Sequence, residues 1–255
     1  MVICKICGNK MSEYGHAEIL NKYNITYYMC EQCGFIQTED PYWLGEAYSS
    51  AIADSDIGLL SRNIMLSKNI SGIINGVFND AKTFLDYGGG YGIFTRIMRD
   101  NGFDFEWYDK YCKNLFAIGH ERTKMHYDIV TAFELMEHLQ NPKEEFEQLC
   151  SLADNIVCTT VLQPVEKPRL DEWWYFCLDH GQHISIYTEK TMKHLAKITG
   201  KYYMHYGDIH VFSSDPISKA KFFLCCRFPT IVNKVFKRRS LLSDDYEKIT
   251  GKSLK

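Results

Sequence analysis

Short apolar runs alternate with amphipathic stretches along residues 83–213. The apolar runs have the length of strands and are bounded by glycine or polar residues, so they predict buried strands. These runs cover residues 83–87, 104–108, 127–134 and 155–161. Between and after them, helical spacing predicts helices at 93–99, 143–151 and 188–199. This alternation predicts an α/β fold with a mostly parallel sheet.

The predicted helices and the last two strands carry local start and stop signals. Asn141 and Pro142 are typical of a helix start, and Thr188 caps the helix that Gly200 ends. Strands at 202–206 and 209–212, joined by a two-residue turn, predict an antiparallel hairpin that completes the sheet. The chain is thereby divided into a cysteine-rich module, a helical lid or linker, the α/β domain and a basic-aromatic tail. Their predicted bounds are 1–38, 39–78, 79–213 and 214–255.

Composition narrows the class of protein. Hydrophobic residues make up 45% of the 255 residues and charged residues 24%, as in ordinary globular proteins. A net charge of -3 shows none of the basic excess that is typical of nucleic-acid binding. No apolar run is long enough to span a bilayer, and the first residues do not resemble a signal peptide. We therefore expect a soluble, cytoplasmic protein.

Four of the ten cysteines form two copies of the motif C-x-x-C-G. The pairs are Cys4 with Cys7 and Cys30 with Cys33, and a predicted strand at 24–29 leads into the second pair. Such spacing predicts a zinc ribbon. Four thiolates leave no open coordination position, so we expect a structural zinc ion. Two unrelated pairs, one of them redox-active, are the alternative.

A glycine loop follows the first strand of the α/β domain. Asp86 precedes glycines at 88, 89, 90 and 92, and a helix follows directly. A dinucleotide-binding loop would need glycine at 93, where Ile93 stands, and a phosphate-binding loop would need Gly-Lys-Ser/Thr. Asp109 ends the next strand, 17 residues after Gly92, where an acid can accept hydrogen bonds from ribose hydroxyls.

Residues 80–142 resemble class I S-adenosylmethionine-dependent methyltransferases, through the D-x-G-x-G-x-G loop, Asp109 and the block from Asp128 to Pro142. The resemblance implies a Rossmann-like sheet and S-adenosylmethionine as cofactor. Its contacts would come from Asp86 at the methionine end, the glycine loop, the ribose acid, the end of the fourth strand and the helical lid. The residues expected in these roles are Asp86, Gly88, Gly89, Gly90, Asp109, Phe133, Tyr48 and Arg62.

The segment after Asp109 departs from this family. Only 18 residues separate Asp109 from Asp128, where the family fits a helix, a third strand and an acid that binds adenine. The acid is missing. Apolar packing from Leu115 and Phe116 is expected to hold the adenine instead.

The acceptor side is expected in the long segment 162–187 and at the end of the fourth strand. His183 lies in that segment, and Glu137 and His138 follow the strand. Methylation of a hydroxyl requires removal of a proton, for which histidine is suited near neutral pH. His183 is the first candidate base, followed by His138 and Glu137; hydrogen-bonded core residues are the alternative. Aromatic residues at 173–176 suit either substrate stacking or the core.

A narrower group shares more of the chain: class I methyltransferases with an N-terminal zinc ribbon, associated with bacterial surface-polysaccharide and deoxysugar biosynthesis. The shared motifs are the two C-x-x-C-G pairs, residues 56–59 with 62–63, the glycine loop, 137–139 and 181–185. This resemblance implies O-methylation of a sugar hydroxyl, on a glycan or an activated sugar. The related sugar C-methyltransferases carry a further C-terminal domain, of which this sequence shows no sign, so we expect methylation of oxygen more than of carbon.

Two other functions remain open. An RNA methyltransferase could use the zinc ribbon for binding, but residues 1–38 contain only three lysines: Lys5, Lys10 and Lys22. A non-catalytic cofactor-binding module is the second. The tail 219–239 mixes aromatic and basic residues, which suits contact with an anionic membrane surface or packing on its own domain or a partner. Nothing in the sequence indicates the oligomeric state.

Overall fold

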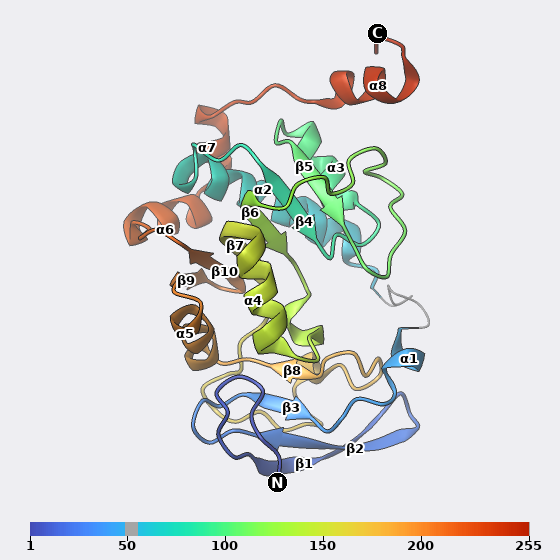
Figure 1. The fold of residues 1–255 in the computed structure, drawn as a ribbon, viewed down its shortest axis with the longest axis vertical. Helices are drawn as coiled ribbons and strands as arrows, with labels where there is room; N and C mark the ends of the chain where they lie inside the picture. The colour runs from blue at the N-terminus through green and yellow to red at the C-terminus, as the bar shows by residue number, and fades with distance from the viewer. Residues whose placement is uncertain (49–55, 255) are drawn as a thin grey trace. The chain divides into compact units, whose positions relative to one another are not determined.

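The computed structural model describes residues 1–48 and 56–254, which form two compact units (Figure 1). The first unit contains the described part of Met1–Ala53, with Phe133–Ser151 and Val157–Ser214. The second contains the described part of Asp54–Ala132, with Leu152–Ile156 and Asp215–Lys255. Both are assembled from stretches that lie far apart along the chain, whereas the predicted segments are contiguous.

A six-stranded sheet has the order β5-β4-β6-β7-β10-β9. Its strands are β4 (Phe84–Tyr87), β5 (Phe105–Tyr108), β6 (Tyr127–Ala132), β7 (Ala153–Thr159), β9 (Tyr202–Tyr206) and β10 (Ile209–Ser213). Strand β4 pairs in parallel with both β5 and β6, while β9 and β10 form an antiparallel hairpin. The predicted α/β class, with a mostly parallel sheet and a terminal hairpin, is confirmed.

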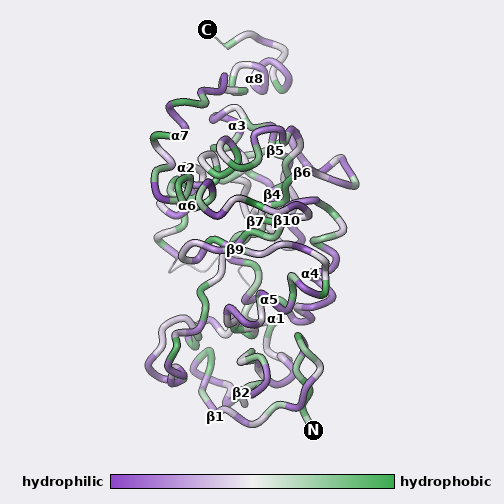
Figure 2. Tube along the Cα trace, turned by 90° about the vertical axis from the view of Figure 1, so that its left-hand side faces the viewer, coloured by the Kyte–Doolittle hydropathy of each residue, from purple (hydrophilic) through white to green (hydrophobic). Residues whose placement is uncertain are grey.

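Burial explains why these segments form strands. Leu85, Val130, Val157 and Val211 have no exposed surface. The trace is correspondingly green where it passes the labels β4, β7 and β10 in Figure 2. Apolar runs of this length can bury both faces only inside a sheet that is covered on both sides.

The third strand of the family is replaced by irregular chain. Residues 110–126, all of them described, contain no named strand, and only an isolated parallel bridge joins Trp107 to Glu121. The Trp107 N–H donates to the carbonyl of His120 (2.7 Å), and the Arg122 N–H donates to the carbonyl of Trp107 (2.8 Å). The short connection thus gives the backbone groups of Trp107, on the outer edge of β5, hydrogen-bond partners without forming a full strand.

The C-terminal tail packs on the second unit. Helices α6 (Lys219–Arg227) and α7 (Pro229–Val235) lie against α2 (Leu59–Val77) (Figure 1). The approach is close because α2 has glycines there: a Cβ at Gly76 would lie 2.2 Å from the Cys225 Sγ. Of the placements expected for the tail, packing on its own domain is the one observed.

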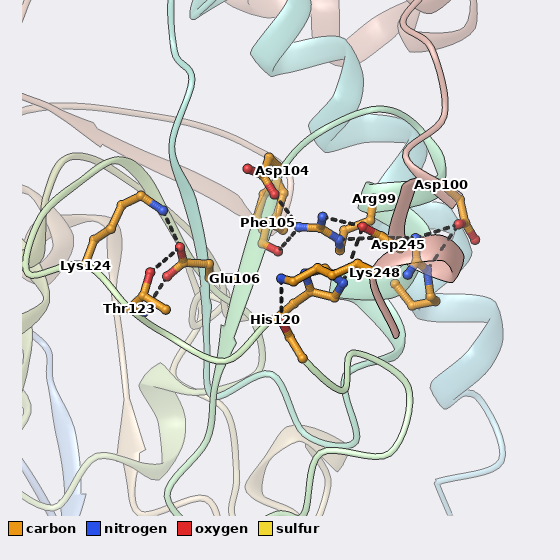
Figure 3. A network of polar contacts seen from close by, with 12 residues as sticks. Arg99, Asp100, Asp104, Phe105, Glu106, His120, Thr123, Lys124, Asp245 and Lys248 are labelled. Atoms are coloured by element: carbon orange, nitrogen blue, oxygen red, sulfur yellow. Dashed lines mark hydrogen bonds and ion pairs between the residues drawn. The ribbon is translucent and has the colours of Figure 1, made fainter. Parts of the chain in front are cut away.

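The last helix, α8 (Leu242–Thr250), is held by a buried polar network (Figure 3). Arg99, at the end of α3 (Ile93–Asp100), donates to both carboxylate oxygens of Asp245, at 2.8 and 2.7 Å. The Arg96 Nη2 lies 2.8 Å from the same carboxylate. Burial opposes ionisation of Asp245, but the hydrogen bonds and charge of Arg99 lower its pKa overall.

The first unit contains a second sheet, of order β1-β2-β3-β8. Its strands are β1 (Ser12–Ile19), β2 (Tyr23–Met29), β3 (Ile36–Thr38) and β8 (Ser185–Ile186). The last strand comes from the long segment 162–187, and it pairs antiparallel with β3. The core beneath the sheet combines Tyr27 of β2 with Trp43, Tyr175 and Phe176. The cysteine-rich module therefore shares its core with the segment expected to face the acceptor.

The remaining helices of the first unit are short. They are α1 (Leu44–Ala47), η1 (Met136–His138), α4 (Pro142–Leu152), η2 (Trp174–Phe176) and α5 (Glu189–Ile198). The Thr188 hydroxyl accepts a hydrogen bond from the Thr191 N–H, as its predicted capping role requires. Among the described helices, none combines the length and the apolar character needed to cross a bilayer.

Candidate functional site

The four cysteines of the two C-x-x-C-G motifs converge. Their Sγ atoms all lie within 4.8 Å of one another, with Cys4 3.6 Å from Cys33 and Cys7 3.5 Å from Cys30. Sulfur atoms bound to zinc at about 2.3 Å in a tetrahedron lie about 3.8 Å apart. Gly8 and Gly34 follow each pair with positive φ (72° and 79°), which closes the turns. The donor set and its spacing fit a tetrahedral zinc ion.

The glycine loop connects β4 to α3 in the second unit. Gly88, Gly90 and Gly92 have positive φ (74°, 55° and 86°), conformations that L side chains rarely adopt. Gly89 is constrained by space, because a Cβ there would lie 2.7 Å from both the Asp86 Oδ2 and the Trp107 Cδ1. The loop can keep this shape only with glycine, and its backbone is open to close approach by a ligand.

Asp86 lies beneath the loop and is almost fully buried. It accepts hydrogen bonds from the hydroxyls of Thr95 (2.9 Å) and Thr131 (3.1 Å). Burial raises the pKa of Asp86 to about 7, although both hydroxyls oppose this shift. Its partners are neutral, so a nearby cation such as an ammonium group would favour the ionised form.

Asp109 closes the loop from the end of β5. Its Oδ2 accepts the Gly90 N–H (2.9 Å), and its Oδ1 accepts the N–H groups of Tyr111 and Cys112 (2.7 Å each). A carboxylate oxygen has two lone pairs, so Oδ2 keeps one acceptor position. The carboxylate thus orders the loop and retains capacity for a hydroxyl donor.

Leu115 and Phe116 lie beside the glycine loop. Their N–H groups both donate to the carbonyl of Tyr91, at 3.0 Å. The two side chains are 47% and 54% exposed, an accessible apolar surface. Their contact with adenine stays a prediction.

The other cofactor residues named from the sequence are distributed over both units. Arg62 lies in the second unit and forms a two-point ion pair with Asp56, at 3.1 and 2.6 Å. Phe133 directly follows β6, and Tyr48 directly follows α1, both in the first unit. The Tyr48 ring lies 6.2 Å from the His138 ring. The motif 56–59 with 62–63 is described throughout, whereas residues 49–55 of the predicted lid lie outside the described residues.

The three candidate catalytic residues come together in the first unit. The chain turns sharply at Glu134 (φ 48°), where Thr159 holds both its N–H (3.0 Å) and its carboxylate (2.8 Å). The short helix η1 follows and carries Glu137 and His138. Ligand atoms of Glu137, His138 and His183 all lie within 4.8 Å of one another. Residues 45 positions apart along the chain therefore form one cluster of a carboxylate and two imidazoles.

His183 is fixed by its surroundings. Its Nδ1 lies 2.6 Å from the carbonyl of Tyr175, and its ring contacts the rings of Tyr175 and His138, with centroids 4.6 and 5.0 Å away. Burial, with a smaller contribution from His138, lowers the pKa of His183 to about 3. The imidazole is therefore neutral at pH 7, with a lone pair to offer but low basicity.

The aromatic residues at 173–176 divide between two roles. Tyr175 and Phe176 are buried in the core of the first unit, whereas Trp174 is 71% exposed. The Tyr175 hydroxyl contacts the Thr160 hydroxyl (2.9 Å) and accepts the Val161 N–H (3.0 Å). The core role is confirmed for two of them, and Trp174 is left as the accessible aromatic surface.

Sequence reasoning missed several residues that position these groups. Thr95 and Thr131 hold Asp86, and the Trp107 indole donates to the carbonyl of Gly90 (3.0 Å). Thr95 and Thr131 have no exposed surface, and a hydroxyl at a position that faces the core is the one signal that could have found them.

Comparison with known proteins identifies the family. The sequence model described as "Methyltransferase domain" matches residues 65–204, more than half of the chain. No curated protein matches the chain.

Solved structures with a similar fold include three methyltransferases. Mitomycin 7-O-methyltransferase is 13% identical with a TM-score of 0.41, and the match covers 58% of this chain and 53% of that one, about half its length. An O-methyltransferase family protein from Burkholderia thailandensis is 14% identical (TM-score 0.46), with 69% of each chain covered. Magnesium protoporphyrin IX methyltransferase from Synechocystis is 11% identical (TM-score 0.41), with 68% of this chain and 94% of that one covered.

The family match runs from α2 to β9 and includes the glycine loop and the cluster after β6. The chain belongs to the methyltransferase-domain family.

Proposed function

We propose that this protein transfers a methyl group to a sugar hydroxyl, on a bacterial surface glycan or an activated sugar. The observation that carries this proposal is the cluster of Glu137, His138 and His183. It brings together one carboxylate and two imidazoles, groups that can accept the proton a hydroxyl would lose. The sugar itself is inferred from the resemblance to methyltransferases with an N-terminal zinc ribbon.

The cofactor would be held by the second unit's glycine loop. S-adenosylmethionine, when bound, supplies a methyl group that its sulfonium already activates. The backbone at Gly88, Gly89 and Gly90 offers close approach, and Asp109 keeps one acceptor position on Oδ2 for a ribose hydroxyl. Asp86, buried among neutral partners, suits a cationic amino group. We assign the ribose to Asp109 and the methionine end to Asp86.

The remaining chemistry concerns one proton. As the hydroxyl oxygen forms its bond to the methyl carbon, the carbon–sulfur bond breaks and its electrons stay on sulfur. The hydroxyl proton must leave to a base for charge to balance. His183 offers a neutral imidazole, and Glu137 a carboxylate with no described partner. We assign the proton to His183, with His138 and Glu137 as neighbouring acceptors.

The zinc ion is proposed as a structural element. Four thiolates would fill its coordination shell, which leaves no position for substrate. The module also shares its core with Trp43, Tyr175 and Phe176. Loss of the ion would therefore disturb the segment that carries His183.

RNA as acceptor is disfavoured by the state of the lysines in the module. The Lys5 ammonium donates to the carbonyl of Gln140, and the Lys22 ammonium pairs with Glu46, each at 2.7 Å. Two of the three cations in residues 1–38 thus have contacts within the protein, which leaves little free positive charge for a phosphate backbone.

Peripheral contact with a membrane is a further proposal for α6 and α7. Although these helices pack on α2, they keep exposed apolar side chains interleaved with basic ones. The exposed apolar residues are Phe223, Leu224, Phe228, Ile231, Val235 and Phe236. Such a surface suits anionic lipid headgroups, beside which surface glycans are assembled.

The test is a methyl-transfer assay with radiolabelled S-adenosylmethionine against nucleotide sugars, lipid-linked oligosaccharides and RNA. Label in a sugar product is the expected result. Label in RNA alone would overturn the sugar assignment. Binding of S-adenosylhomocysteine without turnover on any acceptor would favour a non-catalytic module.

A further inference from the structure

The strongest unexplained feature outside the cofactor loop is the side chain of Glu137. It has no exposed surface, and no described residue forms a hydrogen bond with either of its carboxylate oxygens. Burying an ionised carboxylate without a partner is unfavourable. The other buried carboxylates of the described chain have partners: Asp86 two threonines, Glu106 a lysine and a tyrosine, Asp245 two arginines. Among the described residues, Glu137 is thus the buried carboxylate without a partner, as a carboxylate that binds a ligand would be.

The two histidines beside Glu137 are oriented as metal ligands are. The His183 Nδ1 lies 2.6 Å from the carbonyl of Tyr175, and the His138 Nδ1 lies 3.1 Å from the carbonyl of Gln182. A carbonyl oxygen only accepts, so each Nδ1 must carry the hydrogen. In the neutral rings Nε2 is then the nitrogen with the lone pair. Metal-bound histidines characteristically donate their second nitrogen to a backbone carbonyl or carboxylate in this way.

The separations leave room for an ion. Ligand atoms of the three residues lie within 4.8 Å of one another. No hydrogen bond or ion pair joins Glu137 to either ring in the described structure. An ion about 2.1 Å from each ligand holds two ligand atoms up to about 4.2 Å apart, so atoms within 4.8 Å of one another reach it with shifts of at most about 0.6 Å. The carboxylate supplies negative charge and the imidazoles supply nitrogen, a combination preferred by divalent transition metals.

We propose that Glu137, His138 and His183 bind a divalent transition-metal ion, at a site separate from the four-cysteine cluster. Two nitrogens and one carboxylate leave coordination positions open, unlike the four thiolates of Cys4, Cys7, Cys30 and Cys33. Resting on the proposed function, the ion would take over the role assigned there to the free imidazole. With both Nε2 lone pairs on the metal, it would act as a Lewis acid that lowers the pKa of the acceptor hydroxyl, and the proton would leave to water. Metal binding itself does not depend on that function.

The test is a titration of the zinc-loaded full-length protein with Mn²⁺, followed by electron paramagnetic resonance of the free ion. Mn²⁺ prefers nitrogen and oxygen ligands, so it leaves the thiolate site to zinc. One Mn²⁺ per chain is the expected result. Glu137→Gln and His138→Gln should each weaken binding at least tenfold. A titration with Co²⁺ covers softer ions, and absorption bands without thiolate charge transfer would place it at the same residues.

The matched control is His210→Gln. His210 is also a fully buried histidine, but both of its nitrogens have partners, the Tyr203 hydroxyl (2.9 Å) and the carbonyl of Thr160 (3.0 Å). This variant should bind Mn²⁺ as the wild type does. Circular dichroism shows whether the His183→Gln variant folds. If that variant misfolds, His138→Gln still tests the site, because His138 is only half-buried.

The outcomes separate this proposal from the proposed function. If neither Mn²⁺ nor Co²⁺ binds beyond the zinc site, or if Glu137→Gln and His138→Gln bind as tightly as the wild type, the metal site is wrong. Calorimetric titration with S-adenosylhomocysteine on the same samples tests the cofactor site independently. Cofactor binding without metal binding removes only the metal site, and metal binding without cofactor binding leaves the metal site standing.

Discussion

Two buried carboxylates, one in each unit, have opposite surroundings. Asp245 in the second unit faces Arg99 and Arg96 and joins α8 to α3 (Figure 3). Glu137 in the first unit is equally buried and has no described partner. A carboxylate surrounded by cations holds a structure together, whereas one without a partner imposes a cost that only a function can explain. The difference separates a structural network from a site.

The largest effect is expected when the structural network loses its central cation. Arg99→Met should lower the free energy of unfolding by about 3 kcal/mol, because Asp245 stays buried with an incomplete set of partners. Urea denaturation measures it. Asp104→Ala is the control: this partner of Arg99 is 65% exposed, so its loss should cost less than about 1 kcal/mol. Equal effects from both variants would contradict the distinction.

The surroundings of Asp86 are intermediate between those of Asp245 and Glu137, because its hydrogen-bond partners are neutral hydroxyls. Its pKa of about 7 lies above the ordinary value of 3.8, so the folded state holds the proton more tightly than the unfolded state. Stability should therefore fall as pH rises from about 4 to about 7. Asp86→Asn should abolish this slope and be about 2 kcal/mol more stable at pH 8.

The same substitution should weaken S-adenosylhomocysteine binding at least tenfold, measured by calorimetry. The amide carries no charge, so it cannot form an ion pair with the ligand's ammonium group. Thermal melts of the variant and the wild type across this pH range test the predicted dependence of stability on pH. An unchanged slope in Asp86→Asn would assign the pH dependence to another group.

Glu137→Gln tests the carboxylate without a described partner, and its effect on stability should be opposite to that of Arg99→Met. Without added divalent ions the variant should be about 1 kcal/mol more stable than the wild type, because it buries an amide in place of a charge. Its turnover should fall about 100-fold, with cofactor affinity unchanged. Denaturation and steady-state kinetics on one preparation test both. A stability loss comparable to that of Arg99→Met would make Glu137 a structural residue.

The smallest effect on stability is expected at the exposed aromatic surface. Trp174→Ala should change the free energy of unfolding by less than about 0.5 kcal/mol while raising KM for the acceptor several-fold. Val165→Ala, on the same segment and fully exposed, is the matched control for both measurements. An unchanged KM for Trp174→Ala would remove this side chain from acceptor binding.

Much of the fold follows from local patterns. The strands of the six-stranded sheet, the cap at Thr188 and the hairpin turn after Tyr206 occur within two residues of where the sequence predicts them. Each depends on the preferences of a few adjacent residues, which the sequence states directly. The four cysteines also converge as their spacing predicts. Each C-x-x-C-G turn is local, and the antiparallel pairing of β1 with β2 between the two motifs brings them together.

Only the tertiary structure decided which segments far apart along the chain pair with one another. The strand at 185–186 extends the sheet of the cysteine-rich module, and Tyr175 and Phe176 fill its core. These contacts bring His183 to Glu137 and His138. The sequence by itself determined which residues have the chemistry: a buried acid before glycines, four thiolates, two histidines and a glutamate. It could not show that one acid would be surrounded by arginines and another left without a partner, because burial and partners depend on chain segments that meet only on folding.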